Sequence, residues 1–243
     1  MRILITGCGF IGSHLYKNDS NVYLFVDKKE KPDKLNLPFK QVDLADNQKL
    51  EFIILDFKPD LVIHTAANKY IDRCEANALS SFNDNLLASY NLCQLKEQYG
   101  FKLVYISTDK AVNPTSLYGQ QKSICEKMVL EVGGTVVRLV NILWSTGSIL
   151  PIWTELLKQG KKIEVRGKDI TRKMMTIDEA VDIIYRAVDY PNTIVLPKNY
   201  IEQNIYQLAL TLTSVENIIL TEPLFMEKLV EEIALPYEKV LYL

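Results

Sequence analysis

The chain has 243 residues, of which 48% are hydrophobic and 24% are charged, and its formal net charge is −2. This length is sufficient for one α/β domain with a small appended lobe, and the charge gives no electrostatic basis for binding nucleic acid or an anionic membrane. No apolar run reaches the length of a membrane span, and the first residues have the pattern of a strand rather than a secretion signal. We therefore expect a cytoplasmic protein. The four cysteines show neither a Cys-x-x-Cys spacing nor a pairing with histidine, so neither a disulfide nor a metal site is expected.

The first predicted strand, residues 2–6, leads directly into Gly7-Cys8-Gly9-Phe10-Ile11-Gly12. A Gly-x-Gly-x-x-Gly that follows a strand and opens a helix is the fingerprint of a dinucleotide-binding unit. The first glycine permits the tight turn, the second lets the backbone approach a pyrophosphate, and the third allows close helix–strand packing. The helix expected at 10–17 then offers its free N–H groups to phosphate. A glycine turn that serves packing alone is the simpler alternative.

The second predicted strand, residues 21–26, ends in Asp27. Its distance from the glycine loop is that of the carboxylate that binds the adenosine ribose hydroxyls, which favours cofactor binding over a packing turn. A carboxylate repels a 2′-phosphate, so NAD is preferred to NADP. Lys28 and Lys29 offset part of that repulsion, and NADP is kept as the alternative cofactor.

Strand and helix patterns continue to alternate, which predicts a Rossmann-type, doubly wound α/β fold with a parallel sheet. Further strands are expected at 39–42, 60–64, 101–106, 134–138 and 163–165, and helices at 46–57, 78–99, 117–131, 149–159, 177–189, 203–213 and 223–233. We expect an NAD(P)-binding domain over 1–140. Residues 141–243 are expected to form a small substrate-binding lobe over the cofactor cleft, not an independent domain.

The stretch from Ser107 to Lys122 combines two candidate catalytic pairs. Asp109 and Lys110, a possible acid/base pair, follow a buried strand, and ligands bind at the carboxyl ends of parallel strands. Tyr118 and Lys122 lie on one face of the next predicted helix, where the ammonium lowers the pKa of the phenol. The phenol can then accept a proton from a substrate hydroxyl. Either pair alone would more simply be an exposed surface pair, and their combination favours catalysis.

These motifs resemble the extended short-chain dehydrogenase/reductases, and among them the inverting, CapD-like UDP-N-acetylglucosamine 4,6-dehydratases of bacterial polysaccharide biosynthesis. The specific match is Ser107-Thr-Asp-Lys-Ala-Val-Asn-Pro114 followed by Tyr118-Gly-x-x-Lys122. Relatives that retain the C5 configuration usually carry Asp-Glu in place of Asp109-Lys110. Other segments similar to the family are 64–69, 75–78, 137–151, 171–180 and 196–198.

The resemblance implies a set of site residues. The implied catalytic residues are Thr108, Asp109, Lys110, Tyr118 and Lys122. The implied cofactor contacts are Gly7, Gly9, Phe10, Ile11, Gly12, Asp27, Asp43, Leu44, Ala66, Ala67, Lys69, Asn85, Ser107, Tyr118 and Lys122. The implied substrate contacts are Lys69, Asn141, Ser145 and Arg172. The chain departs from the family at Val140, which replaces a glycine, and at Glu222, which replaces an arginine that commonly contacts the nucleotide diphosphate.

The implied reaction removes water from a nucleotide sugar through a transient 4-ketone, while bound NAD(P) holds the hydride taken from C4. Tyr118 would take the 4-hydroxyl proton, Lys110 the C5 proton, and Asp109 would protonate the departing 6-hydroxyl. A 4-epimerase or ketosugar reductase would need Tyr118 and Lys122 but neither Asp109 nor Lys110, and a non-catalytic dinucleotide-binding protein would need none of them. Relatives pair the helices corresponding to 78–99 and 117–131, whose apolar stripes here predict a homodimer or higher homo-oligomer.

Overall fold

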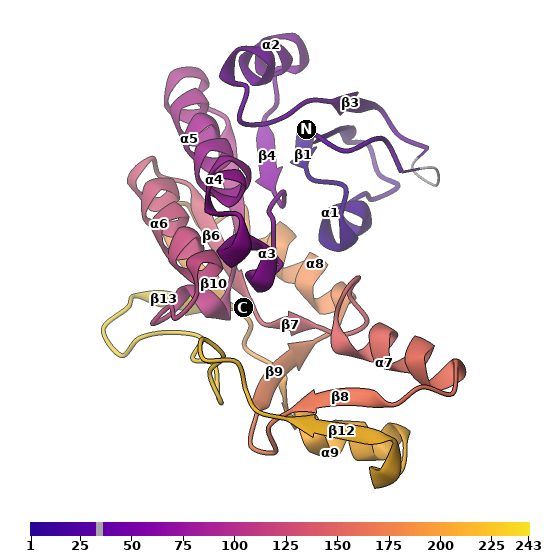
Figure 1. The fold of residues 1–243 in the computed structure, drawn as a ribbon. Coiled ribbons are helices and arrows are strands. Elements are labelled where there is room, and N and C mark those ends of the chain that lie inside the picture. Colours follow the sequence, from indigo (N-terminus) through magenta and orange to yellow (C-terminus); the bar gives the residue numbers. More distant parts are fainter. Residues whose placement is uncertain (33–35) are drawn as a thin grey trace.

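The computed structural model describes residues 1–32 and 36–243, and an eight-stranded parallel sheet forms its centre (Figure 1). The strand order is β13 (Val240–Tyr242), β10 (Thr193–Leu196), β6 (Thr135–Leu139), β5 (Lys102–Thr108), β4 (Leu61–His64), β1 (Arg2–Thr6), β2 (Val22–Asp27) and β3 (Phe39–Gln41). The chain winds outward in both directions from β1, so the order reverses between β1 and β4. Ligands of such sheets bind at this reversal, beyond the carboxyl ends of the strands. The predicted Rossmann-type fold is confirmed.

The central strands are buried on both faces, which explains their continuous apolar runs. Ile3–Ile5 in β1 and Leu61–Ile63 in β4 have no exposed surface. A parallel sheet covered by helices on both sides requires such runs, because no strand position faces water. Each strand predicted before residue 140 is present within two residues of its expected bounds.

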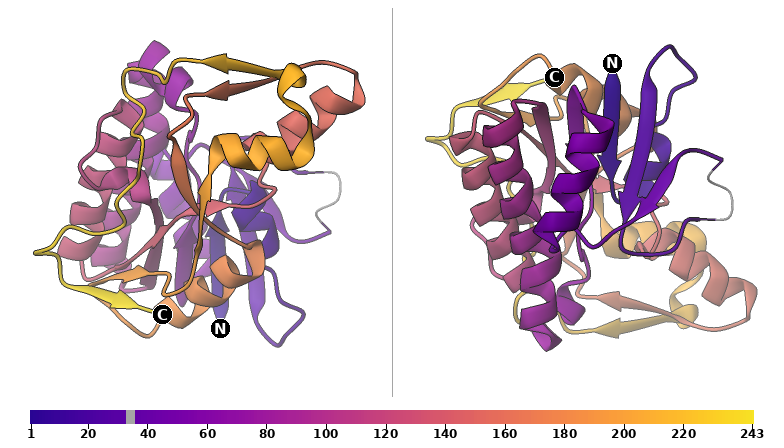
Figure 2. Two further views of the ribbon diagram at one scale, coloured as in Figure 1. Left: turned by 90° about the horizontal axis from the view of Figure 1, so that it is seen from below. Right: turned by 90° about the horizontal axis from the view of Figure 1, so that it is seen from above.

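Helices cover both faces of the sheet (Figures 1 and 2). On one face α2 (Asn47–Phe57), α5 (Ala88–Tyr99) and α6 (Leu117–Glu131) contribute to one apolar core, and on the other α1 (Phe10–His14) and α8 (Ile177–Ala187) pack against a second. Full burial of each large aliphatic side chain in these cores stabilises the fold by about 1.5–3 kcal/mol. The two cores fix the sheet edge at which the candidate site lies.

The helix predicted over 78–99 is present but not continuous. It consists of α4 (Ala78–Ser81), the π-helical segment η1 (Phe82–Leu87) and α5, and a further helix, α3 (Ile71–Ala76), precedes it. The π turn contains the buried Asn85, whose side chain bonds to Asn68 and Gln121. Apolar periodicity does not report such contacts, and π turns frequently occur at functional sites.

A smaller part of the molecule lies beyond the carboxyl edge of the main sheet (Figure 1). It contains the three-stranded sheet β11 (Ile201–Asn204), β9 (Thr171–Met175) and β7 (Asn141–Ile142), and the parallel pair β12 (Ile218–Thr221) and β8 (Ile163–Arg166). Its helices are α7 (Ile149–Lys158), α9 (Ile205–Leu212) and the single turn η3 (Val215–Asn217). A separate apolar core around Trp153, Ile163 and Ile205 supports it.

The chain after residue 140 is shared between the two parts. It leaves the main sheet after β6, but α8, β10 and β13 return to it. Within the described ranges, no helix is sufficiently long and apolar to cross a membrane.

The predicted helix at 223–233 is wrong. This segment is irregular apart from a bridge between Thr171 and Val230, and it runs along the outside of the molecule (Figure 2). Most of its apolar side chains, including Phe225 and Leu229, are exposed, and Ile233 at its end packs against the two main cores. The charged side chains of the segment instead bond to the loop before α6, and these contacts replace helix formation.

Candidate active site

Of the three glycines in the loop after β1, one has open space where a side chain would be. A Cβ at Gly7, whose φ is +86°, would lie 2.7 Å from the Ala66 nitrogen, and a Cβ at Gly12 would lie 1.9 Å from the Gly7 carbonyl oxygen. These two glycines are required by the turn and by helix packing. At Gly9 nothing lies within 4 Å of the same position. The exposed backbone of Gly9 therefore leaves room for a ligand to approach.

A cavity of about 430 Å³ opens beside this loop at the carboxyl ends of β2 and β4. Asp27 lies on its wall and accepts hydrogen bonds from the Cys8 nitrogen (2.8 Å) and the Lys29 nitrogen (3.0 Å). These bonds fix the carboxylate, and each oxygen keeps a lone pair for a further donor. The residues predicted for the cofactor that line this cavity are Gly7, Gly9, Asp27, Asp43, Leu44, Ala66 and Ala67.

The cavity wall also contains residues that the sequence did not indicate. Among them are Thr65, Asn68, Tyr70 and Arg73, and the Arg73 guanidinium lies 4.4 Å from the centre of the Tyr70 ring. They belong to the loop after β4 and to α3, and a strand end opposite the glycine loop is the signal that would have located them.

The remaining predicted cofactor residues lie outside the wall of this cavity: Phe10, Ile11, Gly12, Lys69, Asn85, Ser107, Tyr118 and Lys122. Asn85 is buried behind it, where its Oδ1 accepts from the Asn68 nitrogen (2.8 Å) and its Nδ2 donates to Gln121 (2.8 Å). It thus holds the loop after β4 against α6. Ser107 donates to Glu126 (2.5 Å) rather than facing a ligand.

Tyr118 and Lys122 are both buried in the first turns of α6. The Lys122 Nζ donates to the Ile106 carbonyl (2.7 Å), and burial lowers the pKa of this amine to about 8. Burial, followed by the charge of Asp109, raises the pKa of the Tyr118 phenol above its ordinary value. Across the described residues no hydrogen bond joins the two side chains. The expected lowering of the Tyr118 pKa by Lys122 is therefore wrong for this structure, because desolvation of the phenol outweighs it.

Asp109 and Lys110 form an ion pair at the end of β5, in the short helix η2 (Asp109–Ala111). The Asp109 Oδ1 accepts from the Lys110 Nζ (3.0 Å) and from the Thr108 hydroxyl (2.9 Å). Its Oδ2 is buried and has no hydrogen-bond partner among residues 1–32 and 36–243. An unpaired buried acceptor costs about 1–3 kcal/mol, so such a group warrants a functional explanation.

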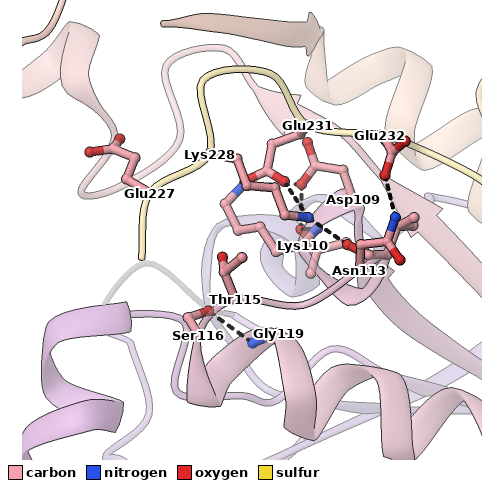
Figure 3. Close-up of polar contacts among 12 residues, drawn as sticks. Asp109, Lys110, Asn113, Thr115, Ser116, Gly119, Glu227, Lys228, Glu231 and Glu232 are labelled. Carbon is pink, nitrogen blue, oxygen red and sulfur yellow. Dashed lines mark hydrogen bonds and ion pairs between the residues drawn. The ribbon is translucent and has the colours of Figure 1, made fainter. Parts of the chain in front are cut away.

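The loop between Lys110 and Tyr118 is bound by residues 226–232 of the irregular C-terminal segment (Figure 3). Thr115 donates to the Met226 carbonyl (2.7 Å), Lys228 donates to the Val112 carbonyl (2.5 Å), and Asn113 donates to Glu232 (2.6 Å). These contacts set the position of the loop that joins the two candidate pairs. The sequence did not reveal them, because they join residues more than 100 positions apart.

A second cavity, of about 460 Å³, lies within the smaller part. Asn141 and Arg172 are on its wall, as predicted for substrate contacts, whereas Ser145 is not. Lys69 donates to the Thr146 carbonyl (2.5 Å) and so joins the loop after β4 to the loop after β7. The wall also contains Trp144, Trp153, Arg166, Glu164 and Glu227, which were not predicted.

The family follows from comparison with known proteins. The model of the polysaccharide biosynthesis protein family matches residues 3–230, nearly the whole chain. The chain belongs to this family. The match includes the glycine loop, both candidate catalytic pairs and the wall of the second cavity.

Characterised and uncharacterised relatives share parts of this sequence. An uncharacterised membrane protein of Methanocaldococcus jannaschii is 34% identical over 155 residues, which are 60% of this chain and 46% of that protein. The capsular polysaccharide biosynthesis protein CapD of Staphylococcus aureus is 32% identical over 153 residues, 60% of this chain and 26% of CapD. The UDP-glucose 4-epimerase of Rickettsia canadensis is 27% identical over 203 residues, 74% of this chain and 58% of the epimerase. The matched region thus spans between about a quarter and about three fifths of these relatives.

Solved structures share the fold at low sequence identity. The dTDP-glucose 4,6-dehydratase DesIV of Streptomyces venezuelae, solved with NAD bound, superposes with a TM-score of 0.86 at 18% identity, over 96% of this chain and 88% of DesIV. The UDP-glucose 4-epimerase of Thermotoga maritima, solved with UDP-glucose, has a TM-score of 0.86 at 21% identity, over 97% of this chain and 90% of the epimerase. These similarities establish the shared fold.

Proposed function

We propose that the chain is a nucleotide-sugar 4,6-dehydratase of polysaccharide biosynthesis that acts on a UDP-N-acetylglucosamine-type substrate with inversion at C5. The observation that carries the proposal is the Asp109–Lys110 ion pair, with one buried carboxylate oxygen unpaired, at the sheet edge that also positions Tyr118. Oxidation and reduction at C4 alone leave this pair without a role. Removal of water requires both an acid and a base there.

The cofactor proposed for this reaction is NAD, which supplies reversible hydride transfer when bound. The residues beside the first cavity fit a dinucleotide: the backbone of Gly9 is open to a pyrophosphate, and the Asp27 carboxylate is held at the end of β2 for ribose hydroxyls. Lys28 pairs with Asp84, so less of its charge is available to a 2′-phosphate. This pairing supports NAD over NADP.

Proton transfer at C4 is assigned to Tyr118. Its oxygen would accept the proton of the substrate 4-hydroxyl, and Lys122 lies four residues along the same helix. The pKa of about 8 keeps Lys122 predominantly charged at neutral pH.

Elimination of water is assigned to Asp109 and Lys110. In the reactive form Lys110 is neutral and Asp109 is protonated: Lys110 takes the C5 proton, Asp109 gives its proton to the 6-hydroxyl, and water leaves. The products of that step are a charged lysine and a carboxylate, which is the ion pair present at 3.0 Å. The ion pair and the reactive pair thus differ only by transfer of one proton across this contact. The unpaired Oδ2 is the carboxylate oxygen available to the 6-hydroxyl.

The smaller part is proposed to bind the nucleotide sugar in its own cavity, with Asn141 and Arg172 on the wall. Lys69 lines neither cavity, but its bond to the Thr146 carbonyl joins a loop beside the first cavity to a loop beside the second. The nucleotide is proposed to lie towards β8, whose residues Glu164, Val165 and Arg166 line this cavity.

Lys110→Met tests the proposal, because it keeps a long side chain and removes the titratable nitrogen. The native protein should convert UDP-N-acetylglucosamine to a product lighter by one water, without added reductant, and in deuterated water it should place one deuterium at C5. The variant should still bind NAD but release no dehydrated product by mass spectrometry. Lys102→Met, at a lysine whose side chain is 57% exposed, serves as the control. Water loss by Lys110→Met, or protium retained at C5, would contradict the proposal.

The second candidate function is a nucleotide-sugar 4-epimerase, which the match to the Rickettsia canadensis epimerase over 74% of this chain favours. An epimerase would interconvert UDP-glucose and UDP-galactose with no change in mass. It would also tolerate Lys110→Met, because neither Asp109 nor Lys110 has a proton to transfer in that reaction.

A further inference from the structure

The second cavity has two arginines on its wall, and the chain itself uses the donors of one of them. The Arg172 Nη1 donates to the backbone carbonyls of Thr171 (3.0 Å), Lys228 (2.9 Å) and Leu229 (3.3 Å). Its Nη2 donates to the Glu227 Oε1 (3.0 Å). Arg172 therefore fastens the C-terminal segment to β9, and few of its donors remain for a ligand.

The other arginine, Arg166, has its donors free. It ends β8, its side chain is 46% exposed, and it makes no hydrogen bond in the part of the chain that the structure describes. Its nearest anionic atoms are the Glu164 Oε1 at 3.6 Å and the Glu227 Oε2 at 3.9 Å. Both separations exceed hydrogen-bond length, so the planar donor fork of Arg166 remains available.

Glu227 lies between the two guanidinium groups and satisfies neither completely. Its Oε1 bonds to Arg172, whereas its Oε2 is buried and lacks a hydrogen-bond partner within residues 1–32 and 36–243. Glu164 is held separately by the Thr221 hydroxyl (3.2 Å). The two arginines and two glutamates give the wall a formal net charge of zero, so an added anion has to compete with Glu227.

Aromatic side chains form another part of the wall. Both tryptophans of the chain, Trp144 and Trp153, line the cavity. Trp144 is 55% exposed and has a φ of +60°, a left-handed conformation that is unfavourable for a bulky residue. Strained residues of this kind gather at ligand sites. An aromatic wall with a free guanidinium suits a nucleoside bearing phosphate groups.

We propose that Arg166 binds the diphosphate of the nucleotide sugar and that Glu227 is an internal anion which the diphosphate displaces from the two arginines. This inference rests on the proposed function, for which it names the residue that selects a diphosphate. Two adjacent phosphates offer the arginine pair more negative charge than one carboxylate. A guanidinium binds phosphate oxygens bidentately, so the exchange gains hydrogen bonds that Arg166 lacks at present.

Binding of UDP to the NAD-loaded protein tests the proposal, with calorimetry and the fluorescence of the two cavity tryptophans as readouts. Arg166→Gln should weaken UDP binding by about tenfold or more, the loss expected for a charged hydrogen bond, and should weaken inorganic pyrophosphate in parallel. Glu227→Gln should tighten UDP binding several-fold, because it removes the competing charge. Arg186→Gln, at an arginine of similar exposure on α8, is the control and should bind UDP as the native protein does.

The outcomes separate this proposal from the dehydratase proposal. Unchanged UDP affinity in Arg166→Gln, weaker binding in Glu227→Gln, or no UDP binding by the native protein would overturn the assignment. If Arg166→Gln removes water at the native rate with an unchanged KM, the role of Arg166 is refuted and the dehydratase proposal is not affected. Arg166-dependent UDP binding without any loss of water would refute the dehydratase and support the assignment.

Discussion

At the scale of single residues, the two oxygens of Asp109 lie in different environments. Oδ1 accepts from Thr108 and Lys110, whereas Oδ2 is buried with no partner in the described ranges. A carboxylate arranged in this way can keep its position through Oδ1 while Oδ2 exchanges a proton. We therefore propose a positioning role for Thr108, whose hydroxyl donates to Oδ1 and so restricts the rotation of the carboxylate.

Tyr118→Phe should abolish turnover of the nucleotide sugar while NAD binding stays largely unchanged. The substitution removes only the hydroxyl, and the ring remains packed in the first turn of α6. Product formation measured by mass spectrometry and NAD affinity measured by calorimetry check the two parts of this prediction. A Tyr118→Phe protein that forms product at close to the native rate would remove Tyr118 from the mechanism.

The sequence located the candidate residues but not their surroundings. Asp109, Lys110, Tyr118 and Lys122 could be predicted because they lie within one short stretch at a strand end. Their surroundings are held by contacts between different elements, such as the buried ion pair between Arg138 of β6 and Glu126 of α6 (2.6 Å). Arg138 also pairs with Glu238 (2.9 Å), so β6 and α6 are joined to the C-terminal segment. A single sequence without pairing information does not indicate such contacts.

The buried His64 should make stability depend on pH. Burial, followed by the charge of Lys122, lowers its pKa from 6.5 to about 3 in the folded protein. Above pH 6.5 the neutral imidazole bonds to Thr6 (2.6 Å) and Ser89 (3.1 Å), and its contribution to stability is fully present. As pH falls from 6.5 towards 3 the unfolded chain binds a proton that the folded chain does not, so stability falls by up to about 1.4 kcal/mol per pH unit.

Urea unfolding of the native protein and of His64→Gln at pH 7 and pH 5 measures this dependence. The native protein should lose up to about 2 kcal/mol more than the variant between these two values, because the variant carries no titratable group at this position. Equal losses in the two proteins would show that His64 does not cause the dependence.

At the scale of elements, the glycines that join β1 to α1 have different structural roles. Gly12 touches the Gly7 carbonyl, whereas Gly9 faces open space. The dinucleotide fingerprint is therefore partly a packing requirement and partly a ligand requirement, and substitution separates the two.

Gly9→Ala should fold with native stability but lose most of its NAD affinity, since the added methyl group occupies only the space proposed for the pyrophosphate. Gly12→Ala should be strongly destabilised, because its Cβ would lie 1.9 Å from a backbone oxygen. The melting temperatures of both variants, measured with and without NAD, test these two expectations. A Gly9→Ala protein that NAD stabilises as much as the native protein would contradict the proposed position of the pyrophosphate.

The helices and strands were predictable where burial leaves a clear pattern of apolar residues. The central strands form continuous apolar runs, and their bounds followed from the sequence alone. The small part was less predictable, because β7 has two residues and β12 pairs with β8, which lies about 55 positions earlier in the chain. At 223–233 the apolar spacing resembled a helix, yet Lys228 and Glu232 bond to the loop between Lys110 and Tyr118, and the segment stays irregular.

At the scale of the whole molecule, α4 and α6 expose apolar side chains away from the sheet. Leu79 in α4 is 84% exposed and Ile124 in α6 is 48% exposed, and Phe82 lies between them in sequence at 48%. Exposed apolar groups on neighbouring helices favour association with a second copy of the chain.

We predict a homodimer that buries these side chains. Light scattering should give a mass twice that of the chain, and Ile124→Glu should give the monomer mass because it buries an unpaired charge in the interface. Phe52→Glu, at a 70% exposed side chain on α2, is the control and should leave the dimer intact. A native mass equal to one chain at all concentrations would refute this prediction.

The interleaving of the chain between the two parts limits how this protein can be recombined with its relatives. The three-stranded sheet takes β7 and β9 from one segment of the chain and β11 from another, and the parallel pair takes β8 from the first and β12 from the second. A chimera that exchanges only one of these segments would pair β9 with a β11, and β8 with a β12, of different parents, while β7 and β9 would stay together. Residues 141–175 and 201–221 therefore have to be exchanged together for a transplanted small part to retain its own strand pairing.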